Sequence, residues 1–282
     1  MNWANALDDF LQALAFIGIY AVLIFVARLL IQLTIPGKLN DALAKNDNPA
    51  VGITLAGYYI ATSIIFIGVL AGPSAGFVKD LIAVSLYSLA GLVLLTISGF
   101  ALDKLVMTKF CNITAILEKH NAGMAAVRFG FYVATGLVAA GSVFGQGGGP
   151  ETMIAFFALG QAVLFLFAKI YDLTTPFDLQ QEIGAGNVAA GVSFGGSVIA
   201  LGIIIARAIA GDFVAWGPSL IFFGVMTVAG VVMLQILRVV MDKVLLAGHN
   251  LNREIAEDRN VAAGFVEMSI AIAFALVLAA LM

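Results

Sequence analysis

Eight long apolar runs dominate this sequence, and they restrict the chain to one class of fold. Each run approaches or exceeds the roughly 20 residues that a helix needs to cross the hydrocarbon core of a bilayer. Polar or Gly/Pro-containing segments separate the runs, and these connections are too short to form a soluble domain. The expected helices cover residues 10–34, 50–71, 81–106, 122–144, 152–173, 188–210, 218–246 and 261–281.

The charge content agrees with this reading. Only 11% of the 282 residues are charged and 62% are hydrophobic, whereas a soluble domain carries roughly 25% charged residues on its wet surface. The chain cannot cover itself with polar side chains, so the lipid bilayer is its expected partner. The net charge of −3 includes no basic run, which argues against a nucleic-acid partner. The sequence therefore predicts an all-α polytopic membrane protein.

Lysine and arginine mark one side of the predicted bundle. Cytoplasmic loops carry an excess of these residues, and the connections after the first, third, fifth and seventh helices hold most of them. The opposite side has only Lys79 and Arg207. We therefore expect both termini outside the cytoplasm and the longer loops inside it.

An internal repeat relates the two halves of the chain. Asn48 and Asn187 are 139 residues apart, as are Asn121 and Asn260, and the same offset relates several other positions. We expect a first four-helix repeat over residues 1–144, a linker over 145–150 and a second repeat over 151–282. Because four helices return the chain to the starting side, the expected symmetry is a pseudo-twofold along the membrane normal. A second offset of 73 residues links Asn48 to Asn121 and Asn187 to Asn260, which indicates that each half is itself a duplicated helix pair.

The joint between the halves is the glycine-rich stretch GQGGGP, residues 145–150. Its composition is typical of a flexible linker. A phosphate-binding loop is not predicted, because no Gly-Lys-Ser/Thr follows the glycines.

The stretch GNVAAGVSFGGSVIALGI (186–203), preceded by YDLTTPFDLQQEI (171–183) and followed two helices later by EDRNVAAGF (257–265), resembles a known family. It is similar to the YjfL-like bacterial inner-membrane proteins, which form domain-of-unknown-function family 350. The resemblance covers nearly the whole chain as two tandem copies. In the first copy Pro49 follows Asn48, and Ala-Gly-Met follows Asn121. The resemblance implies a four-helix membrane unit without an assigned catalytic residue, and a link to envelope-stress and polyamine-related gene sets.

An asparagine stands just before each even-numbered helix. These four residues are Asn48, Asn121, Asn187 and Asn260. Asparagine is a preferred N-cap, since its side-chain oxygen accepts a free N–H of the first helical turn. An alternative is that the four helix N-termini converge on an anion.

Small residues follow the asparagines at helical spacing. Small residues let helices approach closely in lipid, so we expect helix packing through Gly52, Gly57, Gly191, Gly195 and Gly196.

Arg128 and Glu267 occupy matching positions in the two repeats, seven residues after their asparagines, and carry opposite charges. Ionisable residues inside a membrane usually face the bundle interior and have a partner. We expect a buried Arg128–Glu267 ion pair on the axis, as a structural lock between the halves or as a gate.

Two Asp-Lys pairs end the third and seventh helices. Asp103-Lys104 and Asp242-Lys243 are expected as solvated cytoplasmic interface pairs, with a cation-attracting vestibule as the alternative. No spacing of His, Cys or acidic residues predicts a metal or catalytic site, and no cofactor is expected.

These features leave three functions, of which the third, a lipid-modifying or other membrane enzyme, is not expected because no catalytic arrangement stands out. The first is a channel or transporter for a small ion or solute in the bacterial inner membrane, with Arg128 and Glu267 at its centre. The second is a structural or regulatory component of an envelope-stress system that recruits cytoplasmic partners. A homo-oligomer is open in both cases.

Overall fold

The computed structural model describes residues 3–37, 39–244 and 250–282, and every regular element in this part is a helix; the side chains of residues 3–6 and 242–244 are not described. Eight helices are long and apolar enough to cross a membrane. They are α1 (Trp3–Thr34), α3 (Pro49–Leu70), α4 (Phe77–Ala101, continued by the π-helical turn η1, Leu102–Val106), α6 (Ala122–Val143), α7 (Pro150–Thr174), α9 (Val188–Ile209), α10 (Trp216–Val244) and α12 (Val261–Leu281). The expected spans are confirmed to within a few residues at most ends.

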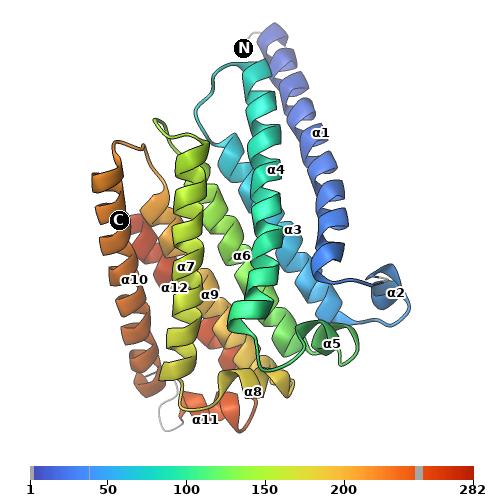
Figure 1. Ribbon diagram of the computed structural model, residues 1–282, viewed down its shortest axis with the longest axis vertical. Coiled ribbons are helices and arrows are strands. Elements are labelled where there is room, and N and C mark those ends of the chain that lie inside the picture. The colour runs from blue at the N-terminus through green and yellow to red at the C-terminus, as the bar shows by residue number, and fades with distance from the viewer. Residues whose placement is uncertain (1–2, 38, 245–249) are drawn as a thin grey trace.

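Four short helices precede α3, α6, α9 and α12 and were not expected from the sequence. They are α2 (Leu39–Ala44), α5 (Asn112–Leu117), α8 (Leu179–Gly184) and α11 (Leu251–Ala256). All four lie at one end of the bundle, opposite the N-terminus (Figure 1). Each has only six residues, too few to show a clear 3.6-residue pattern.

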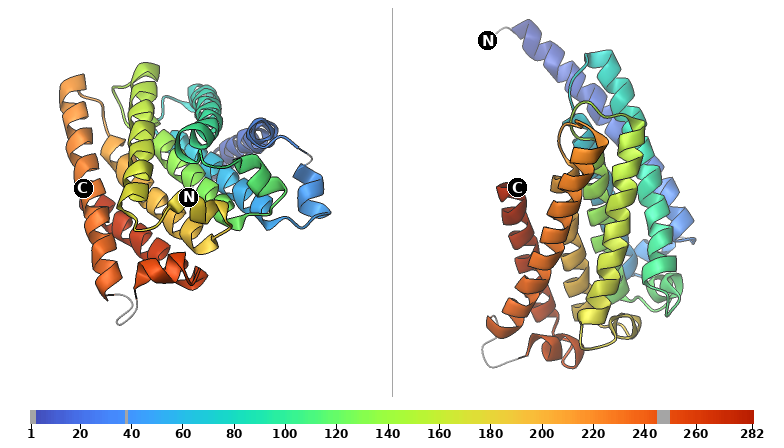
Figure 2. Two further views of the ribbon diagram at one scale, coloured as in Figure 1. Left: turned by 60° about the horizontal axis from the view of Figure 1, so that its bottom comes forward. Right: turned by 60° about the vertical axis from the view of Figure 1, so that its left-hand side comes forward.

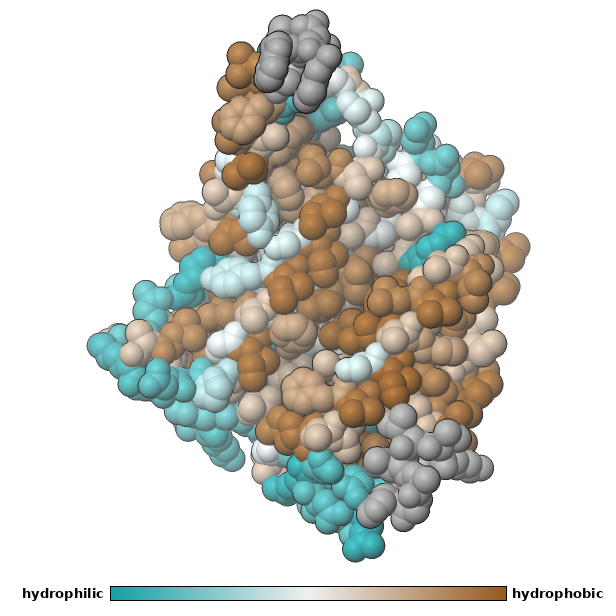
Figure 3. All heavy atoms as spheres, turned by 180° about the vertical axis from the view of Figure 1, so that it is seen from behind, coloured by the Kyte–Doolittle hydropathy of each residue, from teal (hydrophilic) through white to brown (hydrophobic). Residues whose placement is uncertain are grey.

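The long helices form two layers. In Figure 1, α1, α4, α7 and α10 lie in front, and α3, α6, α9 and α12 lie behind them at a slant; the turned views of Figure 2 show the same order. The back helices pack in chain order, α3 on α6, α6 on α9 and α9 on α12. From behind, apolar side chains cover the middle of the molecule and hydrophilic ones gather at the end with the short helices (Figure 3). This distribution is what a lipid-embedded bundle requires.

Glycine brings the helices of the back layer together. A methyl group on Gly57 would lie 2.6 Å from the Phe129 Cα on α6, and one on Gly130 would lie 2.4 Å from the Gly195 oxygen on α9. Such close approach is how helices associate in lipid, where burial of apolar area gives no driving force.

Four of the five glycines expected at helix contacts lie there. On α9, methyl groups on Gly191, Gly195 and Gly196 would lie 2.1, 2.6 and 2.2 Å from atoms of α6 or α12. Gly52 does not belong to this set, since a methyl group there would meet only the Leu43 side chain of α2, at 3.9 Å.

The arrangement of the back layer differs from the expected pseudo-twofold. The back helices form a row in the order α3–α6–α9–α12. The 139-residue repeat relates α3 to α9 and α6 to α12, and both members of the second half lie two places further along this row. A half-turn about an axis between the halves would reverse the order of one half. The packing order therefore fits a displacement by two places, of the kind found in repeat proteins in which each unit contacts its neighbours.

Candidate functional site

The four asparagines cap their helices, as the sequence indicated. The Asn48 side-chain oxygen accepts from the N–H groups of Ala50 and Val51. The oxygens of Asn121, Asn187 and Asn260 accept from Met124, Ala190 and Ala263 respectively. The residue before each asparagine has a positive φ, at Asp47, His120, Gly186 and Arg259. A left-handed residue is a common helix C-cap, so the same short helix, left-handed residue and asparagine recur four times. This recurrence is structural support for a duplicated helix pair within each half.

The amide nitrogen of each of the first three asparagines reaches into the following helix pair. Asn48 Nδ2 donates to the Ile116 carbonyl at 2.9 Å, Asn121 Nδ2 to Ile183 at 2.7 Å and Asn187 Nδ2 to Ile255 at 2.8 Å. Each carbonyl belongs to the short helix of the next unit. The asparagines therefore join successive units. In each of these three side chains the amide oxygen accepts a hydrogen bond and the amide nitrogen donates one within the protein.

Arg128 and Glu267 do not pair with each other, and that prediction is wrong. Arg128 lies on α6 and Glu267 on α12, and α9 lies between these two helices. Arg128 forms its ion pair with Asp103. Glu267 lies 3.6 Å from Arg238, measured from Oε1 to Nε. Each half thus has its own ion pair, and the predicted passage between the two charges loses its geometric basis.

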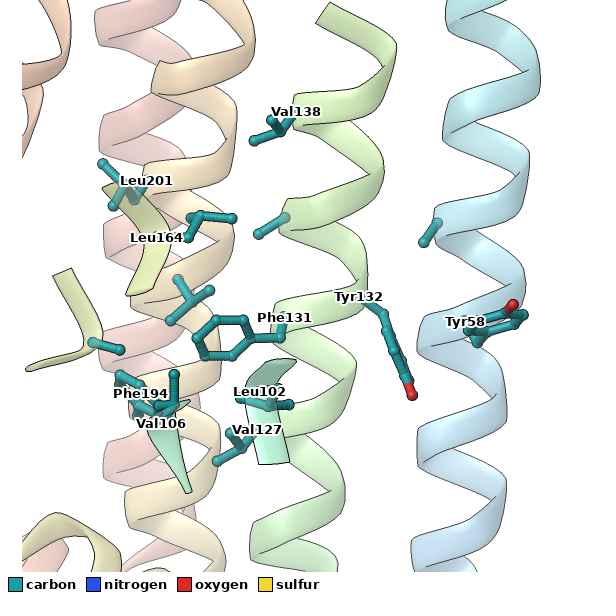
Figure 4. Packing of buried hydrophobic residues seen from close by; sticks show 14 of the residues in the cluster. Tyr58, Leu102, Val106, Val127, Phe131, Tyr132, Val138, Leu164, Phe194 and Leu201 are labelled. Carbon is teal, nitrogen blue, oxygen red and sulfur yellow. The ribbon is translucent and has the colours of Figure 1, made fainter. Parts of the chain in front are cut away.

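Arg128 is the centre of the first-repeat cluster and is 0% exposed, and its Nε is buried without a hydrogen-bond partner among the described residues. Arg128 Nη2 donates to Asp103 Oδ2 and Nη1 donates to the Tyr132 hydroxyl at 3.1 Å. Asp103 Oδ1 accepts from Asn112 Nδ2 at 2.8 Å. Tyr132 extends from α6 towards Tyr58 on α3 (Figure 4), with their ring centroids 5.2 Å apart. A charge at this depth is held by its partners, as the cost of an isolated charge in the membrane demands.

Asp103 lies in the π-helical turn η1, and its side chain is turned inward to Arg128. The Met107 N–H bonds to the Leu102 carbonyl five residues earlier, at 3.0 Å, which inserts an extra residue into the helix. Lys104, next in the chain, remains exposed. The expectation of a solvated Asp103-Lys104 pair is therefore wrong for Asp103. The side chains of the matching Asp242 and Lys243 lie outside the described residues.

The second-repeat cluster surrounds Glu267, which is 3% exposed. Ser193 Oγ donates to Glu267 Oε2 at 2.5 Å. The Arg238 guanidinium lies 4.0 Å above the centre of the Tyr171 ring and donates to Thr175 Oγ1 at 3.0 Å. Arg238 therefore has attractive contacts besides Glu267, through its position over the aromatic ring and the threonine hydroxyl.

A small cavity of about 10 Å³ lies within the second cluster, close to the volume that one water needs. Ser197, Gln235, Arg238 and Glu267 are among its lining residues. Gln235 Nε2 is buried there without a hydrogen-bond partner among the described residues. In the first repeat the 139-residue offset places Tyr58 opposite Ser197, and Tyr58 donates to or accepts from Thr96 at 2.7 Å. The bulky Tyr58 therefore stands in the first repeat at the position where the smaller Ser197 lines the cavity in the second.

Sequence reasoning missed Arg238 and Tyr171 as parts of the site. Arg238 is six residues before the end of α10, and Glu267 is six residues after the start of α12. Antiparallel neighbours joined by a short connection bring such residues to similar depth. Matching ionisable residues across each helical hairpin would have found the pair, whereas the repeat symmetry pointed away from it.

The comparisons with known proteins place the chain in a family. No curated protein and no solved structure matches it. A family model described as Domain of Unknown Function (DUF350) matches twice, over residues 5–143 and 147–282, and the two matches meet at the glycine-rich joint. Together they cover nearly the whole chain, and the protein therefore belongs to this family as a tandem-repeat member.

Proposed function

We propose that the protein is a non-enzymatic membrane transport component that moves a small cation, in the first place the proton, and that Glu267 is the group that binds it. The observation that carries this proposal is the Glu267 carboxylate, buried within a membrane-spanning helix beside a water-sized cavity. Intramembrane carboxylates of this kind are typical of proton and ion relays.

The surroundings of Glu267 support reversible protonation. When the carboxylate takes up a proton, its attraction for Arg238 weakens, and the arginine retains the Tyr171 ring and the Thr175 hydroxyl. Ser193 can also reverse its role, since a hydroxyl both donates and accepts. The protonated and charged forms can thus exchange without leaving Arg238 unpartnered.

The first-repeat cluster has a different role in this proposal. Arg128 is completely buried and bonded to Asp103 and Tyr132, and the Tyr58 ring packs against Tyr132. We assign it to holding α4 against α6. The transport site therefore lies in the second repeat alone, in place of a gate between the repeats.

Proton flux into proteoliposomes tests the proposal. The purified protein is reconstituted with an internal pH-sensitive dye, and a potassium gradient with valinomycin sets the membrane potential. Wild type should acidify the lumen faster than empty liposomes, and Glu267→Gln should reduce the rate to the empty-liposome level. Glutamine keeps the shape and the hydrogen bond to Ser193 but cannot carry the proton.

Glu257→Gln is the matched control, because Glu257 is exposed and pairs with Arg253. It should transport like wild type. Gel filtration and thermal unfolding establish that Glu267→Gln is folded. Equal flux in wild type and Glu267→Gln, or wild-type flux no faster than empty liposomes, would overturn the proposal.

A further inference from the structure

A cavity lies where the two repeats meet, at the end of the bundle opposite the short helices. Its volume is about 530 Å³, within the range of small-molecule sites. The ends of α3, α6 and α9, the starts of α7 and α10, the 144–149 connection and part of α4 line it. We call it the seam pocket.

The glycine-rich connection forms a fixed wall of the seam pocket. Phe213 N–H donates to the Gln146 carbonyl at 2.7 Å, and Gln146 N–H donates to Asp212 Oδ1 at 2.7 Å. Gly145 has φ +113°, and a methyl group there would lie 2.0 Å from the Gly211 oxygen. The expected flexible linker is therefore an ordered segment bonded to the 211–213 loop. These bonds hold this wall of the pocket in place.

One cationic side chain lines this pocket. Arg207 stands in the last turn of α9 and is half-buried. Among the described residues it has no carboxylate within ion-pair distance and no hydrogen-bond partner; Tyr87, which lines the pocket from α4, has no hydrogen-bond partner there either. Asp212 also lines the pocket, but one of its oxygens already accepts from Gln146. The guanidinium and phenol supply donors without an internal acceptor.

The first repeat has a glycine at the position that matches Arg207. The 139-residue offset places Gly68 opposite Arg207, and a methyl group on Gly68 would lie 2.5 Å from the Ala140 Cβ. The first repeat therefore has no room for an arginine at the matching position. Apolar walls from Phe156, Pro218 and Phe222 complete the seam pocket.

We propose that the seam pocket binds a small organic oxyanion, with its phosphate or carboxylate on Arg207 and Tyr87 and its carbon portion against the apolar walls. The planar guanidinium matches both kinds of oxyanion. The oxyanion can belong to a soluble solute or to a lipid headgroup, since the pocket lies at the end of the membrane-spanning helices. This site is independent of the Glu267 proposal.

Tryptophan fluorescence can report on this pocket. The chain has two tryptophans, and the ring of Trp216 stacks on that of the pocket residue Phe156, with centroids 6.2 Å apart. In a Trp3→Phe background, titration with glycerol phosphate and with acetate should change Trp216 emission. Arg207→Gln should weaken the affinity at least about tenfold, since a hydrogen bond to a charged group is worth that much.

A second experiment tests whether the bound oxyanion belongs to a lipid headgroup. Native mass spectrometry of protein from membranes containing phosphatidylglycerol should show bound phosphatidylglycerol if a headgroup is the occupant, and Arg207→Gln should lose it. Arg253→Gln, at the opposite end and paired with Glu257, is the control and should behave like wild type in both arms. Thermal unfolding confirms that each variant is folded. If neither probe distinguishes wild type from Arg207→Gln, the proposal is wrong.

Discussion

At the residue scale, one repeat position carries two opposite charges that are neutralised in different ways. Arg128 finds its partner on a π-helical turn of the preceding long helix, and Glu267 finds its partner on the uninterrupted α10. In both cases the partner comes from the helix just before it in the front layer. Divergence of a buried charge was tolerated because each helix pair supplied its own counter-charge.

Replacing Asp103 should destabilise the protein more than any exposed substitution. Asp103→Asn leaves the Arg128 charge without a counter-ion at 0% exposure, and breaking a buried pair costs roughly 3–5 kcal/mol. Thermal unfolding in detergent should show a large fall in midpoint. Lys104→Gln, at the exposed neighbouring position, is the control and should change little. A similar midpoint for Asp103→Asn and wild type would mean that the pair does not hold α4 to α6.

At the element scale, the asparagine before each back-layer helix both caps that helix and joins two units. Both Asn187 and Asn260 donate to a glutamate of their own unit, Glu182 and Glu254. Asn187 is also completely buried and donates to Ile255 O of the next unit, whereas Asn260 is exposed. We therefore expect Asn187, inside the row of back helices, to contribute more to stability than Asn260 at its end.

The two asparagines should differ when replaced by alanine. Loss of a cap costs about 0.5–2 kcal/mol, and Asn187→Ala additionally leaves the buried Ile255 carbonyl without this donor. We expect a greater fall in unfolding midpoint for Asn187→Ala than for Asn260→Ala. Equal falls would contradict the joining role. Added phosphate should not raise the unfolding midpoint of the wild-type protein. It would raise this midpoint if the four helix N-termini formed an anion site.

The sequence allowed the spans, the repeat and the caps to be predicted, because apolar length and a capping asparagine act locally. The partners of the buried charges could not be predicted in the same way. Asp103, the partner of Arg128, lies in η1, and no local pattern in the sequence marks this π-helical turn. The ordered 145–149 segment depends on bonds to Asp212 and Phe213, more than 60 residues away, so its glycines alone suggested flexibility.

At the scale of the whole molecule, polar contacts at the short-helix end also join the two repeats. Lys109 forms an exposed ion pair with Asp178, and the N–H groups of Thr108 and Lys109 donate to Gln180 Oε1 at 2.9 and 3.2 Å. The bond to Lys109 lowers the pKa of Asp178 from its usual value, and the bond to Asp178 raises the pKa of Lys109.

These shifts set the pH dependence of the contact. A lowered carboxyl pKa contributes stability above the unfolded value, which is lost as pH falls through the folded value. A raised lysine pKa contributes stability that is lost as pH rises through its folded value. Asp178→Asn should therefore lower the unfolding midpoint slightly at pH 7. The difference from wild type should disappear as the pH falls below the folded pKa of Asp178. A difference that persists once Asp178 is protonated in the folded protein would exclude this cause.

The orientation of the molecule can be determined with Cys111, the single cysteine, which is exposed at the short-helix end. Hydrogen bonds from Thr114 lower its thiol pKa, which favours reaction with maleimides. If both termini are outside the cytoplasm, an impermeant maleimide should label inverted vesicles and leave intact cells unlabelled. Cys111→Ala with Ala75→Cys, in the loop between α3 and α4, should give the opposite pattern. Labelling of Cys111 in intact cells would show that the orientation is the opposite of the expected one.

The direction of the asparagine bonds has a consequence for biosynthesis. Each of the first three asparagines donates to a carbonyl that lies 68, 62 or 68 residues downstream. A helix pair leaving the ribosome therefore carries an unfilled donor until the next pair has been translated. Asn260 ends this dependence by bonding to Glu254, which is already made. Membrane insertion is thus expected to complete the row from its N-terminal end, one helical hairpin after another.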